Sequence, residues 1–137
     1  MNIDYISGFF DADGSITMSK AKSSDKFRTL KIDFTNIKLE ILLEIQKYLK
    51  ENYDITLSIS TKPARKSTHS VSYTLSTSSN INCYKLCELI KSIHPVKRHR
   101  INTVLKYHKL VTVRNGKYNE RQEQRRLAYE RLFFFNS

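Results

Sequence analysis

Apolar and polar residues alternate with a period of two in four short stretches of the chain, a pattern typical of half-buried β-strands. In the clearest stretch, Leu30, Ile32 and Phe34 fall on one side of the alternation and polar residues fall on the other. The four predicted strands span residues 15–22, 27–35, 55–62 and 70–75. Each strand would bury one face in a core and leave a polar face exposed.

Between and after these stretches, apolar residues recur every three or four positions, which predicts amphipathic helices. The first predicted helix begins at Asn2 or Asp4 and ends near Phe10, where Gly14 should close it in a left-handed conformation. The other predicted helices span residues 39–52, 80–93, 96–113 and 118–134. The side chains of the 80–93 helix that should face inward are Leu86, Leu89, Ile90 and Ile93.

Polar or Gly/Pro-containing segments separate these elements. They lie at residues 23–26, 62–67, 94–95 and 115–116. The resulting order is αββαββα followed by one or two further helices, the last of them C-terminal, which predicts an α+β fold with a four-stranded antiparallel sheet backed by helices. The 137 residues suffice for a single domain, 1–137, with a core of about 1–113 and a helical extension over 117–135.

Short hydrogen-bonding side chains and lysines make up the polar faces of the predicted strands. An ordinary solvent-exposed sheet face has the same pattern, but four such strands in a basic protein also suit contact with base edges in a DNA groove. The candidate DNA-contacting residues on these faces are Thr17, Ser19, Thr29, Lys31, Asp33, Ser58, Ser60, Lys62, Ser70, Ser72 and Thr74. The basic residues at strand ends and in loops, where phosphates would pass, are Lys20, Lys22, Lys26, Arg28, Arg65 and Lys66.

The charge is distributed unevenly along the chain. The formal net charge is +11 and the isoelectric point is about 9.7. Residues 1–60 hold 8 Lys/Arg and 9 Asp/Glu, whereas residues 61–137 hold 16 and 4. This bias favours a polyanionic partner bound through backbone phosphates, although a solubilising surface charge is the simpler alternative.

Several classes of protein are excluded by composition. No apolar run approaches the roughly 20 residues of a membrane-spanning helix, and no basic-then-apolar signal opens the chain. The two cysteines give no disulfide framework, so we expect a protein that is not secreted. The compartment itself stays unknown, with an organelle or the cytoplasm of a bacterium or phage host as the options. We expect no membrane partner and no small-molecule substrate.

Cys83, Cys87, His94 and His99 suggest a zinc site only weakly. The two cysteines are four residues apart on a predicted helix, whereas zinc knuckles prefer a Cys-x2-Cys turn. Thiols spaced in this way on one helix face are more often core residues, which is the interpretation that we favour.

The most informative segment is Ile-Ser-Gly-Phe-Phe-Asp-Ala-Asp-Gly, residues 6–14. It places two carboxylates and a glycine at the end of an apolar, small-residue helix, and carboxylates suit a divalent metal such as Mg²⁺. The segment resembles the LAGLIDADG motif of homing endonucleases and related RNA maturases. The positions identical to the family consensus are Gly8, Asp11, Ala12, Asp13 and Gly14. Only one copy of the motif is present, and single-copy members of the family are homodimers.

The resemblance implies a saddle-shaped sheet over DNA and a site at the end of the motif helix. Asp13 would be the direct metal ligand, helped by the backbone carbonyl of Ala12, with Mg²⁺ as the ion and Mn²⁺ or Ca²⁺ able to occupy the same sites. Asp11 could be a second ligand, but we favour a structural role in which it bonds backbone amides at the helix-to-strand turn. The motif residues expected in the dimer interface are Ile6, Ser7, Gly8, Phe9, Asp11 and Ala12.

Two further catalytic positions follow from the resemblance. Asn36 ends the second predicted strand, where relatives often carry Gln, and Lys38 is a neighbouring candidate. Lys97 occupies the position of the family's lysine beyond the third helix and would stabilise the phosphate or the attacking water. Arg98 and Arg100 are alternatives to Lys97 and candidates for contact with phosphate.

The sequence therefore predicts a site-specific homing endonuclease. Such an enzyme would cut both strands of a long pseudo-palindromic DNA site by metal-dependent hydrolysis and leave short 3′ overhangs. The alternatives are an RNA maturase and a non-cleaving nucleic-acid-binding protein of the same fold.

Overall fold

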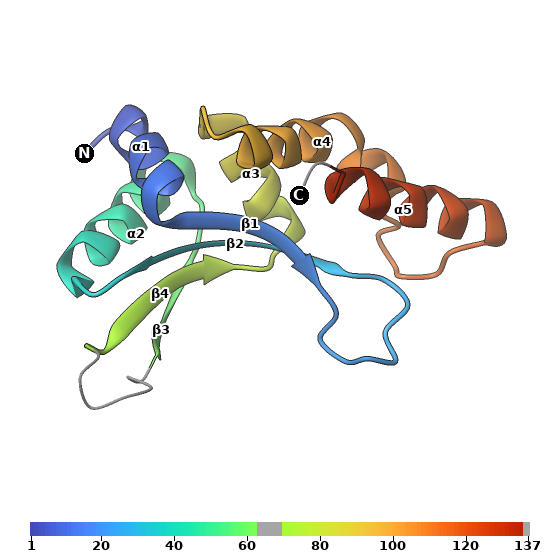
Figure 1. The fold of residues 1–137 in the computed structure, drawn as a ribbon, viewed down its shortest axis with the longest axis horizontal. Coiled ribbons are helices and arrows are strands. Elements are labelled where there is room, and N and C mark those ends of the chain that lie inside the picture. Colours follow the sequence, from blue (N-terminus) through green and yellow to red (C-terminus); the bar gives the residue numbers. More distant parts are fainter. Residues whose placement is uncertain (63–69, 136–137) are drawn as a thin grey trace.

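The computed structural model describes residues 1–62 and 70–135. Its elements follow the order α1 (Ile3–Asp13), β1 (Gly14–Ser19), β2 (Thr29–Asn36), α2 (Leu39–Tyr53), β3 (Ser58–Lys62), β4 (Ser72–Thr77), α3 (Asn80–Leu89), α4 (Pro95–Val111) and α5 (Glu120–Phe133). This order confirms the predicted α+β class and the αββαββα arrangement, with two helices after it (Figure 1).

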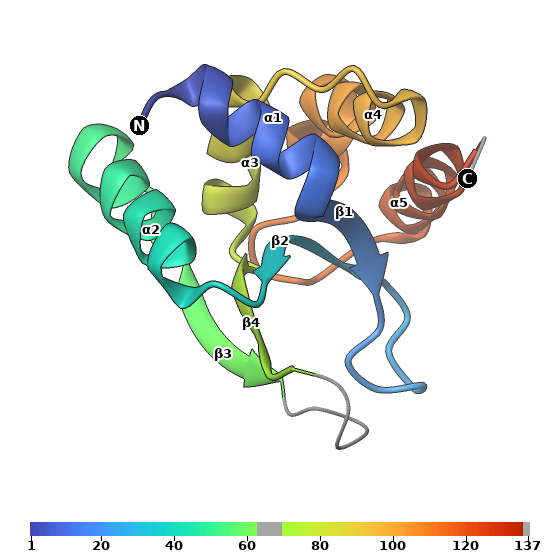
Figure 2. The ribbon, with the colours of Figure 1, turned by 60° about the vertical axis from the view of Figure 1, so that its left-hand side comes forward.

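The four strands form one antiparallel sheet in the order β1-β2-β4-β3. The helices lie on one side of this sheet, and the sheet bends so that its other face is concave and is not covered by any described helix (Figures 1 and 2). A loop of residues 20–28, here called the hairpin loop, joins β1 to β2 and extends away from α1 (Figure 1). The predicted saddle backed by helices is therefore confirmed.

Burial follows the alternation read from the sequence. Leu30, Ile32 and Phe34 of β2 are fully buried, as are Leu75 of β4 and Ile16 of β1 to within 1%. These side chains meet the inner faces of the helices, because α2 contributes Leu42, Ile45 and Leu49 to the same core cluster. The polar residues between them face the uncovered side of the sheet, since neighbours in a strand point to opposite faces.

Gly14 differs from its prediction. It does not adopt a left-handed conformation but has φ −102° and ψ 166°, so the chain passes from α1 directly into β1 without a turn. Crowding explains the glycine instead. A Cβ atom at this position would overlap Cδ1 of Phe10 and would lie 2.8 Å from the Phe10 carbonyl oxygen and 2.9 Å from its Cα.

The third helix was predicted too long. It ends at Leu89, and Ile93, which was expected to face inward, is 83% exposed. The segment after Leu89 leaves the helix because its polar groups bind the end of α1, as described below. The strands are also shorter than predicted at the hairpin loop and before Ser58, although Ile55 and Leu57 are still buried in the core.

One buried histidine predicts a pH-dependent stability. The side chain of His108 contacts the hydroxyl of Tyr129 at 2.8 Å and Oδ1 of Asn80 at 3.1 Å. Burial, with a smaller contribution from the charge of Arg126, lowers the pKa of His108 to about 4. The unfolded chain has a histidine pKa of about 6.5 and therefore binds the proton first. Stability should fall as pH drops from about 6.5 towards 4, by about 3 kcal/mol in total from this group.

Urea unfolding at pH 7 and at pH 4.5 measures this loss. Carboxylates also titrate in the lower part of this range, so the comparison is with His108→Gln, which keeps hydrogen-bonding groups but cannot gain a charge. We expect the variant to lose clearly less stability than the wild type between the two pH values. Equal losses in both proteins would show that His108 does not carry the effect.

Candidate active site and nucleic-acid interface

Helix α1 ends at the edge of the concave face and carries Asp13 as its last residue. The helix begins with Asn2, whose side chain accepts a hydrogen bond of 2.8 Å from the amide of Tyr5. Ile6 and Phe10, both fully buried, hold its inner face against the core. Because the chain enters β1 immediately after Asp13, the exposed carboxylate of this residue has a fixed place beside the sheet.

The structure brings Asn36 together with Asp13. Nδ2 of Asn36 donates a hydrogen bond of 2.9 Å to Oδ2 of Asp13, and Oδ1 of Asn36 accepts a bond of 2.8 Å from the amide of Lys38. The second bond orients the amide group, so that its NH₂ points at the carboxylate. Lys38 therefore contributes through its backbone at this site.

Lys97 reaches the same end of α1 from the first turn of α4. Its ammonium donates to the carbonyl oxygens of Phe10 at 3.0 Å and Asp11 at 2.9 Å, and lies 5.4 Å from the centre of the Phe10 ring. The last carbonyls of a helix carry partial negative charge, which attracts a cation. Lys97 therefore stabilises the turn of helix that presents Asp13.

Asp11 has the structural role that we favoured, with different partners. Its carboxylate accepts hydrogen bonds from the hydroxyl of Ser92 and, at 2.9 Å, from the amide of Ile93. These groups lie between α3 and α4 and not at the turn after α1, where we expected them. Ser7 acts in the same way, since its hydroxyl accepts a bond of 3.0 Å from the amide of Lys91. Hydrogen bonds from residues 91–97 therefore hold α1 in place.

The motif helix presents only part of its predicted interface to solvent. Ile6 is 0% and Ser7 6% exposed in the subunit, so both side chains pack in its own core, and their part in a dimer interface stays a prediction. Both residues lie on the inner side of α1. The outer side carries Gly8 and Ala12, with Tyr5 one turn earlier, all exposed. Phe9 and Asp11 are half-buried at its margins.

Gly8 within α1 and Gly14 directly after it give a matched pair of predictions. Gly14→Ala should destabilise the fold by about 1–3 kcal/mol, because the new methyl group meets backbone atoms of Phe10 that cannot move independently. Gly8→Ala should leave the subunit as stable as before or up to about 1 kcal/mol more stable, since nothing lies within 4 Å of the new atom and alanine favours the helix. Thermal unfolding of both variants under identical conditions, at a protein concentration low enough that each is monomeric, checks the difference. A Gly8→Ala variant as unstable as Gly14→Ala would contradict it.

The concave face carries the polar side chains predicted from the alternation. Thr17 lies opposite Lys31, Ser19 opposite Thr29, and Ser60 opposite Thr74 in the strand register. Residues on this face that we had not named are Ser15, Thr35 and Ser76. The same alternation, continued by one step in each strand, would have identified them.

Some of these side chains already bind one another. The hydroxyl of Ser15 donates a bond of 2.9 Å to Asp33, and the hydroxyls of Thr35 and Thr74 lie 3.3 Å apart. Ser70 is exposed but precedes β4, which begins at Ser72. Arg65 and Lys66, two of the predicted phosphate contacts, lie outside the described residues.

Two arginines that were predicted to contact phosphates bind other groups of the same subunit. The guanidinium of Arg100 donates a bond of 2.9 Å to the carbonyl of Ile16 and lies 5.1 Å and 5.2 Å from the ring centres of Phe133 and Phe134. Arg28 is paired with Glu130 of α5 at 3.4 Å. Both arginines therefore join elements of the subunit, and their contacts with phosphate stay predictions. Sequence alone shows their charge but not these partners.

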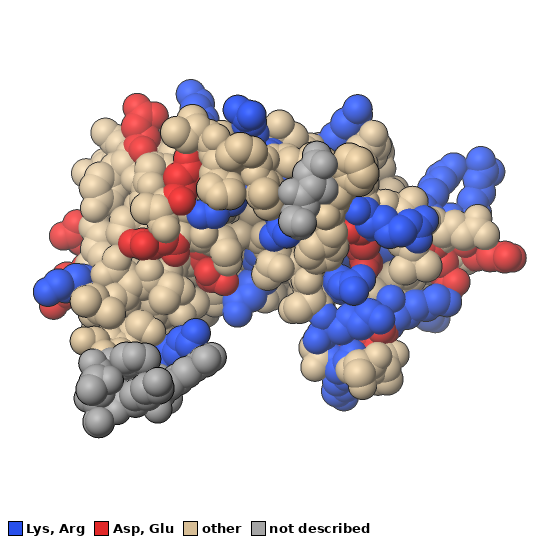
Figure 3. Space-filling model, in the orientation of Figure 1, with Lys and Arg blue, Asp and Glu red and all other residues tan. Residues whose placement is uncertain are grey.

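The remaining basic residues are better placed for a polyanion. Lys20, Lys22 and Lys62 are exposed on the hairpin loop and at the end of β3, and Arg98 is exposed on α4. Figure 3 shows Lys and Arg side chains gathered at the end of the molecule formed by the hairpin loop and α5. The acidic side chains visible in this view lie more often at the α1 and α2 end.

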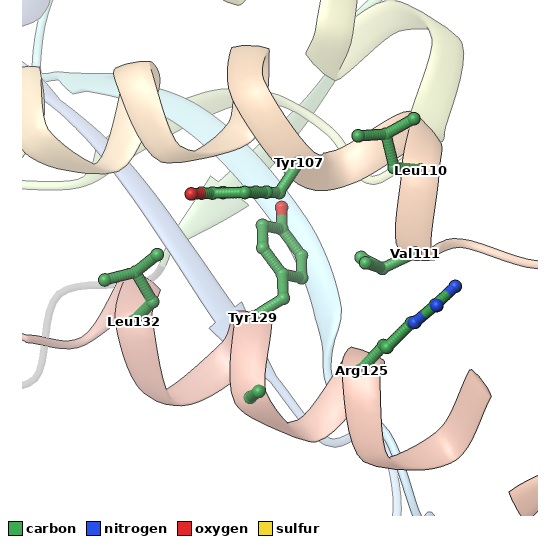
Figure 4. A pocket seen from close by; sticks show the side chains of 7 residues that line it. Tyr107, Leu110, Val111, Arg125, Tyr129 and Leu132 are labelled. Carbon is green, nitrogen blue, oxygen red and sulfur yellow. The ribbon is translucent and has the colours of Figure 1, made fainter. Parts of the chain in front are cut away.

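Two cavities of the described residues lie among the helices, and Asp13 lines neither of them. One of about 400 Å³ is lined by Tyr107, Leu110 and Val111 of α4 and by residues of α5 that include Tyr129 and Leu132 (Figure 4). Its lining is mostly apolar, with no carboxylate to bind a metal. The cysteines lie in the core, as expected of core thiols, since Cys83 is 0% and Cys87 2% exposed.

Metal-binding groups are sparse within one subunit. Among the described residues, no group of three or more His, Cys, Asp or Glu side chains could hold a metal ion. The hard oxygen of Asp13 nevertheless fits Mg²⁺, which typically uses one or two protein carboxylates and completes its shell with water and substrate phosphate. No helix in residues 1–62 or 70–135 is long and apolar enough to cross a membrane.

Comparisons with known proteins agree with this geometry. The family model of the LAGLIDADG-like domain matches residues 2–91. A comparison with curated protein sequences finds no match. The chain is similar to the archaeal intron-encoded homing endonuclease I-Vdi141I, solved in complex with DNA, with 18% identity and a TM-score of 0.61 over 98% of this chain and 83% of that one.

Two other solved structures have similar folds. One is the homing endonuclease I-CvuI in complex with the I-CreI target, with 19% identity and a TM-score of 0.53 over 78% of this chain and 65% of that chain. The other is the LAGLIDADG meganuclease I-CpaMI bound to uncleaved DNA, with 16% identity and a TM-score of 0.54 over 96% and 52%. At these identities the likeness establishes the shared fold.

Proposed function

We propose, since the chain belongs to the LAGLIDADG family, that it is a homodimeric homing endonuclease that cuts both strands of a long pseudo-palindromic DNA site and leaves short 3′ overhangs. The observation that carries this proposal is the exposed carboxylate of Asp13, held by Asn36 where α1 meets the concave polar face. Residues 1–113 would form the core of this domain, and α5 its C-terminal extension.

Asp13 would hold a divalent ion, with the carbonyl of Ala12 as a second oxygen ligand. When bound, Mg²⁺ would activate a water and neutralise charge on the scissile phosphate, and Mn²⁺ or Ca²⁺ could occupy the same position. Asn36 fixes the direction of the carboxylate through its bond to Oδ2.

Lys97 would support the reaction in two ways. Its bonds to the carbonyls of Phe10 and Asp11 keep the end of α1 in place. An ammonium has three donors, so it can make these two bonds and still donate one to a water or a phosphate oxygen. Replacing Lys97 should therefore lower both the rate of cleavage and the stability of the subunit.

A homodimer would bring two copies of this site together. The exposed side of α1 has small residues at Gly8 and Ala12, which would let two such helices approach closely, and close packing of this kind tolerates no added methyl group. The Gly8→Ala variant, expected to fold normally, should therefore weaken the dimer at least tenfold. Sedimentation equilibrium of wild type and variant measures this, with Ala12→Gly as a control that adds no atom. An unchanged dimer would place the interface elsewhere.

Double-stranded DNA would lie along the concave face. The β-strands of this face would present small polar side chains towards the DNA grooves. The exposed side chains of Lys20, Lys22 and Lys62 would contact phosphates. The solved structures with similar folds include complexes with DNA, which supports the same partner here. One subunit would bind each half-site, as expected when a two-fold dimer meets a pseudo-palindrome.

The test uses a library of duplexes with a randomised central region. We expect the protein to retain a defined subset of duplexes in Ca²⁺, to cut that subset in Mg²⁺, and to cut nothing in EDTA. Cleavage unaffected by EDTA would contradict the role of the metal. Tight retention of structured RNA, with no duplex retained, would favour a maturase instead.

A further inference from the structure

The hairpin loop is tied to α5 at its base. In the register, Ser19 and Thr29 form the last pair of β1 and β2, so Arg28 has no partner strand. Its backbone amide instead donates to the two carboxylate oxygens of Glu130, at 3.3 Å and 3.2 Å. Its backbone carbonyl accepts a bond of 2.8 Å from the guanidinium of Arg126. Side chains about a hundred residues away in the sequence thus bind the backbone groups of Arg28 that another residue pair of the sheet would otherwise have bound.

The residues next to Arg28 make contacts with the same part of the chain. The ammonium of Lys26 lies 2.6 Å from a carboxylate oxygen of Glu123. The rings of Phe27 and Tyr118 lie with their centres 4.5 Å apart. Three consecutive residues of the hairpin loop are therefore held by the segment that contains α5, which lies beside it in Figure 1.

The ion pair at the centre of this tether is buried. Arg126 is 4% and Glu130 2% exposed, and Nε of the arginine lies 3.1 Å from the glutamate carboxylate. Arg126 also donates a bond of 2.6 Å to the hydroxyl of Thr112, just after α4. A buried ion pair is a poor source of net stability, because desolvation offsets much of the attraction. The fixed geometry of its hydrogen bonds is what it contributes.

We propose that Arg126 and Glu130 are positioning residues for DNA recognition, which fix the hairpin loop so that it reads the outer base pairs of each half-site. This inference rests on the proposed function. Ser19 lies five residue steps after Gly14 along β1, and at about 3.3 Å per step the strand spans about five base-pair steps. The loop therefore meets DNA far from Asp13, and only the outer positions should depend on the tether.

The position of the hairpin loop matters because the side chains that would contact bases discriminate weakly among them. Ser19 and Thr29, at the mouth of the hairpin loop, form single hydrogen bonds that several bases can satisfy. Discrimination then depends on how well the side chains are placed, within about 0.5 Å for a productive contact. A loop that is free to shift would still meet phosphates through Lys20 and Lys22 but would lose its preference among bases.

The double variant Arg126→Met with Glu130→Leu tests this without leaving a buried charge. Replacing a buried ion pair by apolar groups of similar volume is often neutral for stability. The probe is a duplex library, randomised in turn at inner and outer positions of the half-site selected by the wild type. We expect discrimination at the outer positions to fall about fivefold or more, with the inner positions unchanged. The control, Lys47→Gln with Glu51→Gln, removes an exposed ion pair of α2 and should alter neither.

Each outcome has a defined meaning. A uniform loss over inner and outer positions, or no loss, would overturn the positioning role. If the wild type selects no sequence, the proposed function fails, and hydrogen exchange then tests the tether alone: the amide of Arg28 should exchange at least tenfold faster in the double variant. Equal exchange rates would overturn the inference. Should the double variant fail to fold, Thr112→Val, which removes one contact of Arg126, should produce a smaller change of the same kind.

Discussion

Replacement of Asp13 with asparagine is expected to reduce double-strand cleavage by about a thousandfold or more while DNA binding persists. The amide has the size of the carboxylate and can still accept the bond from Asn36, so the end of α1 should keep its shape. It lacks the negative charge that would hold Mg²⁺. A metal-bound site stabilises the transition state by several kcal/mol, and about 4 kcal/mol corresponds to a thousandfold in rate.

The measurement combines a cleavage assay in Mg²⁺ with a gel-shift assay in Ca²⁺ on the same duplex. Asp4→Asn is the matched control, because it removes an exposed carboxylate from the first turn of the same helix. That control should cut at nearly the wild-type rate. If the Asp13 variant cuts as well as its control, the carboxylate at the end of α1 is not the metal ligand.

Removal of one partner of the buried Arg126–Glu130 pair is expected to cause the largest loss of stability among single substitutions in α5. Glu130→Leu would leave the guanidinium of Arg126 buried without its carboxylate, and Arg28 would lose both bonds to Glu130 from its amide. Breaking a buried pair in this way costs about 3–5 kcal/mol. Arg126→Met should cost a similar amount, because it leaves the carboxylate of Glu130 with only the partial support of Arg28.

Urea unfolding of both single variants and of the double variant forms a complete cycle. The double variant should be less destabilised than either single variant, since no uncompensated charge is then buried, and the coupling should exceed about 2 kcal/mol. Additive losses would indicate that the two side chains act independently. Such a result would also weaken the case for a tether with a fixed geometry.

The sequence predicted those features that depend on local patterns. Alternation over residues 29–35 identified the buried face of β2 and the polar face opposite it, because a strand has a period of two whatever it packs against. The motif at residues 6–14 located Asp13 at the end of a helix. Asn36 was predicted from the family resemblance, at the end of the second strand, and the structure puts its side chain in contact with Asp13.

Features that depend on contacts between distant segments were not predicted. The charge of Arg28 and Arg100 is visible in the sequence, but their partners lie on α5 and on β1, far along the chain. Ile93 fitted the apolar period of the preceding helix. In the structure its amide donates a hydrogen bond to Asp11, and α3 ends at Leu89, before the predicted end. A glycine at position 14 is typical of the end of a helix, which is why the sequence predicted a left-handed stop. In the structure, glycine is needed there because Phe10 leaves no space for a Cβ atom.

The position of the cut on each DNA strand tests the central claim most directly. Duplexes selected from the randomised library would be incubated with the wild-type protein in Mg²⁺, and the ends would be mapped on both strands. We expect two cuts at a fixed short spacing, placed symmetrically about the centre of a pseudo-palindrome, with 3′ overhangs. Duplexes that are bound but left intact, or nicked on one strand only, would contradict a homodimer that carries one Asp13 site for each strand.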